Sequence, residues 1–137
     1  MKPVLVIAAL AFGLAQSKGA FAYEAATCRA IENTIAKAAD RLQKWIDGGR
    51  PSRMALVSVS MKAGLALAYA RDETGWPEPV TDSLLALREG PKPDAMGNLL
   101  TGVNGMQMIH DKASALLAAA GPACPDSSFA EIPAWPT

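Results

Sequence analysis

The sequence is poor in the residues that most often perform catalysis or bind metals. Among 137 residues it has one histidine, His110, and two cysteines, Cys28 and Cys124. It has no G-x-S-x-G motif for a serine nucleophile, no C-x-x-C-H motif for covalent haem and no calcium loop of alternating acidic residues. These absences argue against an enzyme, and we predict neither a catalytic residue nor a cofactor.

An excess of charge of one sign is also lacking. Thirteen basic residues balance thirteen acidic ones, so a nucleic-acid partner has no electrostatic support. The charges are nevertheless unevenly distributed, because residues 29–71 hold eight basic and three acidic side chains, whereas residues 72–137 hold three basic and nine acidic. Two interpretations stay open: the two halves pack together and neutralise each other, or the basic half faces an acidic partner.

Long apolar runs are absent beyond the first residues. Residues 1–22 combine the basic Lys2, an apolar run and the small-residue ending Ala20-Phe21-Ala22, a pattern typical of a signal peptide cleaved after Ala22. The run falls short of the roughly 20 apolar residues that span a bilayer. We therefore expect a periplasmic or secreted protein that is not an integral membrane protein after cleavage. Loss of Lys2 and Lys18 would leave a net charge of about −2.

The remaining chain is one domain in length, and its apolar spacing predicts helices. Residues 28–49 carry apolar side chains at three- and four-residue steps, and residues 52–74 are apolar almost all round, which predicts the most buried helix. The segment "LVSVSM" within the second range alternates like a strand, but its Ala-rich continuation favours helix. A short helix is expected from Thr81, as N-cap, to Gly90, and a fourth from Met96, with Asp94 as its N-cap.

Two cysteines near the two ends of the mature chain predict a disulfide in an oxidising compartment. Cys28 lies in the first expected helix and Cys124 just after the last, and an up-and-down bundle brings these points together only with an even number of helices. We therefore predict an all-α, up-and-down four-helix bundle over residues 23–124, with a short third helix and one disulfide. The Pro-rich residues 125–137 form an extended tail, which Phe129, Ile132 and Trp135 are expected to lay along the bundle.

The stretch "TGVNGMQMIH", residues 101–110, offers the one candidate for a metal site. As a hairpin around Asn104-Gly105 it would align Met106, Met108 and His110, whose thioether and imidazole groups suit Cu(I). As a helix it would place only Met106 and His110 on one face, a pair that could also contribute to a non-covalent b-type haem site in a bundle. Unbroken helical spacing on both sides favours the helix, and then His110 serves packing or a hydrogen bond.

These observations leave several functions open, and they name no binding residues and no oligomeric state. We expect a small exported protein that binds another envelope or secreted protein, as an inhibitor, immunity factor, adaptor or accessory subunit. One alternative is a periplasmic chaperone-like stress protein that exposes apolar surface. Another is a bundle that binds Cu(I) or b-type haem through methionine and histidine.

Overall fold

The computed structural model describes residues 25–49, 53–90 and 103–136, and these residues form helices and no strands. The helices are α2 (Ala25–Ile46), α3 (Arg53–Arg71), α4 (Glu78–Glu89) and α5 (Val103–Ala123). The predicted all-α class and the short third helix are confirmed. The expected fourth-helix start, with Asp94 and Met96, lies outside the described residues.

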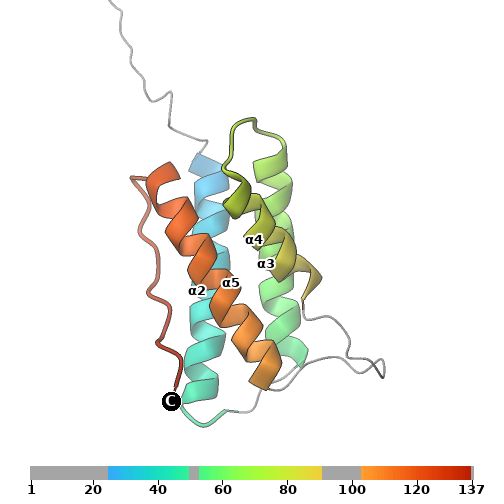
Figure 1. Ribbon diagram of the computed structural model, residues 1–137, viewed down its shortest axis with the longest axis vertical. Coiled ribbons are helices and arrows are strands. Elements are labelled where there is room, and N and C mark those ends of the chain that lie inside the picture. The colour runs from blue at the N-terminus through green and yellow to red at the C-terminus, as the bar shows by residue number, and fades with distance from the viewer. Residues whose placement is uncertain (1–24, 50–52, 91–102, 137) are drawn as a thin grey trace, which may run out of the picture.

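The four helices run alternately up and down and form a closed ring (Figure 1). Each helix packs on the next in the chain, and α5 packs on α2, whereas α3 and α5 lie on a diagonal and contact each other little. The segment "LVSVSM" belongs to α3, so the helical prediction for it is confirmed.

The core lies along the axis of this ring and is almost wholly aliphatic. Every helix contributes side chains that are at most 1% exposed, among them Ile31, Ile35, Leu42, Val59, Leu67, Val80, Leu84, Leu87, Met106, Ile109 and Leu116. Alanines of α2, α3 and α5 are buried between these larger residues and let the helices approach closely. Burial of this apolar surface is the main stabilising contribution to the bundle.

Two glycines follow the last turn of α2. Gly48 has a φ of +104°, its N–H donates to the Trp45 carbonyl, and the N–H of Gly49 donates to the Lys44 carbonyl at 2.9 Å. This is a Schellman motif, in which glycine adopts the left-handed conformation without strain.

The start of α4 differs from the prediction. The helix begins at Glu78, after Pro77, and Thr81 lies one turn inside it. The hydroxyl of Thr81 donates to the Glu78 carbonyl at 3.1 Å, so it does not cap the helix. The reason is that Pro79 fits the first turn, where its missing N–H has no partner to lose.

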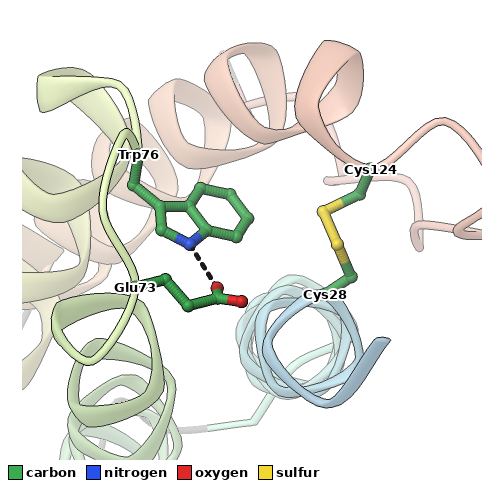
Figure 2. The surroundings of a disulfide bond; sticks show 4 residues. All are labelled: Cys28, Glu73, Trp76 and Cys124. Atoms are coloured by element: carbon green, nitrogen blue, oxygen red, sulfur yellow. Dashed lines mark hydrogen bonds between the residues drawn. A yellow bond between two sulfur atoms is a disulfide. The ribbon is translucent and has the colours of Figure 1, made fainter. Parts of the chain in front are cut away.

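The predicted disulfide is present at the end of the bundle where α2 begins and α5 ends. Cys28 and Cys124 are bonded, with a Cα–Cα distance of 5.8 Å. Figure 2 shows the indole of Trp76 entering the same end from the loop between α3 and α4. Trp76 is buried, and its Nε1–H donates to Oε1 of Glu73 at 2.6 Å. Trp76 thus covers this end of the core.

After Cys124 the chain turns back and follows the bundle as an irregular segment (Figure 1). Phe129, Ile132 and Trp135 pack against the core, as the sequence predicted. The ring of Trp135 lies 5.1 Å from that of Trp45 on α2 and 5.5 Å from that of His110 on α5. Two features thus link α2 to α5: the Cys28–Cys124 disulfide, and Trp135, whose ring packs against a residue of each helix.

Candidate functional site

The outward face of α3 carries an apolar surface that no other described element covers. Of the six large apolar side chains that are exposed in the described residues, five lie on α3. They are Met54, Val57, Met61, Leu65 and Tyr69, which we call the α3 stripe. Met54 is 69% exposed and Met61 is 70% exposed. Steps of three and four residues place the whole stripe on one side of the helix, over roughly 23 Å.

The prediction that α3 would be the most buried helix is wrong. Its inward face, which includes Leu56, Val59, Ala63 and Leu67, is buried like that of its neighbours. In a ring of four helices, however, each helix touches only its neighbours, and one side remains exposed. Because α3 is apolar all round, the exposed side is apolar as well. Single apolar side chains on a surface are ordinary, but a contiguous row marks an interaction site.

The structure does not bring the three candidate metal ligands together. Residues 103–110 belong to α5, so the helical prediction is confirmed for them; Thr101 and Gly102 lie outside the described residues. Met106 is buried in the core, and Met108 lies about 200° around the helix from it. The hairpin that would align Met106, Met108 and His110 is not formed by the described residues.

His110 occupies the seam between α5 and the tail. Its Nδ1 lies 3.2 Å from Oδ1 of Asp111, and its ring packs at 60° to the indole of Trp135. The pKa of the Asp111 carboxyl is lowered, first by this hydrogen bond and then by one from Gln107. The carboxylate can only accept, so Nδ1 is the donor. His110 therefore has the packing and hydrogen-bonding surroundings that the helical interpretation anticipated.

Contact with the second half does not neutralise several of the basic side chains that the structure describes in the first half. Lys44 pairs with Asp40 on its own helix, at 3.4 Å. Among the residues that the structure describes, Arg29, Lys37, Lys62 and Arg71 form no ion pair within 4 Å. The two halves do pack together through α2, α3, α4 and α5, but through apolar side chains. The positive charge of α2 and α3 is thus available to solvent or a partner.

Sequence reasoning missed the α3 stripe although every residue of it is visible in the sequence. The combination of a helix that is apolar all round with a four-helix bundle could have predicted it. In such a bundle one side of each helix faces solvent, so that side of an all-round apolar helix is an exposed apolar surface.

Within the described residues, no helix combines the length and the apolar character needed to cross a membrane. Comparison of the chain with protein-family models, with curated proteins and with solved structures finds no match. The function has to be inferred from the geometry of the chain itself.

Proposed function

We propose that this chain is an exported protein that binds another envelope or secreted protein through the α3 stripe. The observation that carries the proposal is the row of exposed apolar side chains from Met54 to Tyr69. Burying such a row against a partner is favourable by about 25 cal/mol for each Å² of apolar surface removed from water. Methionine suits a contact surface because its unbranched side chain adapts to different partner shapes.

Export is supported by two features that agree. The first 22 residues have the pattern of a cleaved signal peptide, and the fold joins Cys28 to Cys124, a bond that persists in oxidising compartments. A small disulfide-bonded bundle that presents one apolar face suits the role of an inhibitor, immunity factor, adaptor or accessory subunit.

Site-specific photo-crosslinking tests this proposal. A benzophenone amino acid replaces Met61 in the full-length chain, which is expressed in its own host and irradiated in the intact envelope. We expect one discrete protein adduct, identified by mass spectrometry and lost when Leu65→Asp is added to the same chain. The control position is Lys112, which is exposed on α5, across the bundle from α3.

Three results would contradict the proposal. Absence of any adduct from position 61, or the same adducts from positions 61 and 112, would remove the α3 stripe as a binding face. A ladder of many adducts from position 61 would instead assign the stripe to the chaperone-like alternative, because a holdase contacts many unfolded chains.

A further inference from the structure

We infer that the occupant of the α3 stripe is an amphipathic helix of a partner protein, flanked on both sides by carboxylates. This inference rests on the proposed function and specifies the chemistry of the partner. It follows from three properties of the face: the spacing of its apolar residues, the small residues beside them, and the charges along its two edges.

The spacing of the stripe is that of a helix-packing seam. Steps of three, four and seven residues separate four exposed positions: Met54, Val57, Met61 and Ala68. Leu65 and Tyr69 lie beside these positions and make the apolar row broader. Knobs-into-holes packing between helices uses this repeat. The row is therefore compatible with a partner helix packed along α3, and the vesicle measurement below distinguishes that occupant from a lipid surface.

A small residue in the C-terminal half of the face allows close approach. Position 64 of α3 is glycine and position 68 is alanine. A Cβ at Gly64 would meet the Cγ and Cδ atoms of Arg88, at 3.4 and 3.5 Å, so Arg88 already covers Gly64 from the α4 side. Ala68 is exposed, and a partner helix can lie nearer to the α3 backbone beside its short side chain than beside Met54.

Cations line both edges of the stripe. On the α2 side, Lys62 and Lys37 line a surface hollow of about 290 Å³ together with Asn33, Ala36 and Asp40. On the α4 side, the aliphatic part of Arg88 lies next to Gly64, and the hydroxyl of Ser60 donates to the Arg88 carbonyl. The exposed Arg71 extends this edge toward the end of α3.

Acidic groups are also present near the stripe, but among the described residues none forms an ion pair with Lys62, Arg71 or Arg88. Asp40 is paired with Lys44, Asp72 follows Arg71 in the chain, and α4 carries the exposed Glu78, Asp82 and Glu89. The centre of the face is thus apolar with positive edges, which is complementary to an apolar seam flanked by Asp and Glu. A second copy of this chain fits poorly, because an antiparallel pairing centred on Met61 brings the two Lys62 side chains close together.

Binding of model helices to the purified, disulfide-bonded mature protein tests the inference. Three helix-stabilised peptides share one leucine seam and differ only in flanks of Glu, Gln or Lys. We expect the Glu peptide to bind about tenfold more tightly than the Gln peptide at low salt, with the difference shrinking at high salt. The Lys peptide should bind most weakly. The readout is fluorescence anisotropy of the labelled peptide.

Two variants locate the interaction. Met61→Lys should abolish binding of all three peptides, and it should keep the helical circular dichroism, because Met61 is 70% exposed. The charge reversal K62E combined with R88E should invert the order, so that the Lys peptide binds most tightly. K112E is the matched control and should leave the order unchanged, since Lys112 lies on the diagonal helix α5.

The outcomes separate this inference from the function beneath it. Equal binding of the three peptides, or no binding while position 61 still crosslinks to a protein, would overturn the acidic helix and leave the proposed function standing. Absence of both peptide binding and crosslinking would overturn both. Met61-dependent binding to phosphatidylglycerol vesicles, or a dimer in sedimentation that Met61→Lys dissociates, would assign the face to lipid or to a second copy and would also overturn the inference.

Discussion

At the scale of single residues, the only histidine of the sequence is in contact with two side chains. The Nδ1–H of His110 donates to Asp111 on the same helix, and the imidazole ring packs against the indole of Trp135 in the tail. Asp111 in turn accepts from Gln107 one turn earlier, at 3.0 Å. The Nδ1–H of His110 and the side-chain amide of Gln107 therefore share one carboxylate oxygen of Asp111 at this seam.

The lowered pKa of Asp111 gives a pH prediction. A carboxyl whose folded pKa lies below its unfolded value contributes stability that is present above the unfolded value and is lost as the pH falls through the folded pKa. His110→Phe keeps a ring against Trp135 but removes the hydrogen bond, so the pKa of Asp111 should rise. Carbon-13 NMR titration of the carboxyl, mainly below about pH 4, measures this. An unchanged titration would show that His110 does not hold the carboxylate.

Replacing His110 by alanine should destabilise the fold modestly. The change removes a ring contact with Trp135 and a hydrogen bond, so we expect the free energy of unfolding to fall by about 1–2 kcal/mol. Urea denaturation measures the loss, and Lys112→Ala, on the exposed side of the same helix, is the control. Because His110 lies across the bundle from α3, the crosslink from position 61 should persist. Loss of that crosslink in a folded H110A protein would contradict the structural role.

At the scale of the element, α3 is the helix whose two faces are chemically alike but differ in their surroundings. Leu67 is 1% exposed and Leu65, two residues earlier, is 54% exposed. Local sequence does not distinguish them, since both are leucines in an alanine-rich helix. Only the positions of α2 and α4 decide which one is covered.

Substitutions on the two faces should separate folding from binding. Leu67→Ala should lower the free energy of unfolding by about 2–4 kcal/mol, through lost burial and a cavity. Leu65→Ala should change it by less than about 0.5 kcal/mol but should weaken partner binding. Paired denaturation and binding measurements on the two variants check this. A similar stability loss in both would mean that the α3 stripe is covered within the folded chain.

At the scale of the whole molecule, the described residues form four helices and a returning tail, joined by one disulfide into a single unit. The disulfide closes a loop with a sequence separation of 96 residues, and the tail then crosses the same seam in the opposite direction. The core is built from all four helices, so removal of any one would expose the apolar faces of two neighbours.

Reduction of the disulfide should therefore weaken the fold without changing its architecture. On the chain-entropy model the loss is about 4.7 kcal/mol, because a long loop is released in the unfolded state. Denaturation with and without reductant, compared with the C28S/C124S double variant, measures it. The circular dichroism should remain helical in both states. Identical denaturation midpoints would show that the bond adds nothing to stability.

The sequence predicted local features well and exposure poorly. The three- and four-residue steps from Ile31 to Leu42 anticipated α2, and the even number of helices anticipated the pairing of Cys28 with Cys124. The start of α4 was missed because Thr81 is a good N-cap residue, whereas Pro77 and Pro79 decide the boundary by conformation. The α3 stripe and the position of Trp135 depend on long-range packing, which periodicity does not encode.

The position of the disulfide also determines how the molecule bears mechanical load. A force pulling on the chain before Cys28 and after Cys124 passes directly from one sulfur to the other. The helical segments between the two cysteines then carry no tension. Only contacts outside this loop are lost, namely those of the tail residues Phe129, Ile132 and Trp135 and of the α2 residues before Cys28. If the protein were tethered by both ends in the envelope, the α3 stripe would keep its shape under strain until a reductant opened the bond.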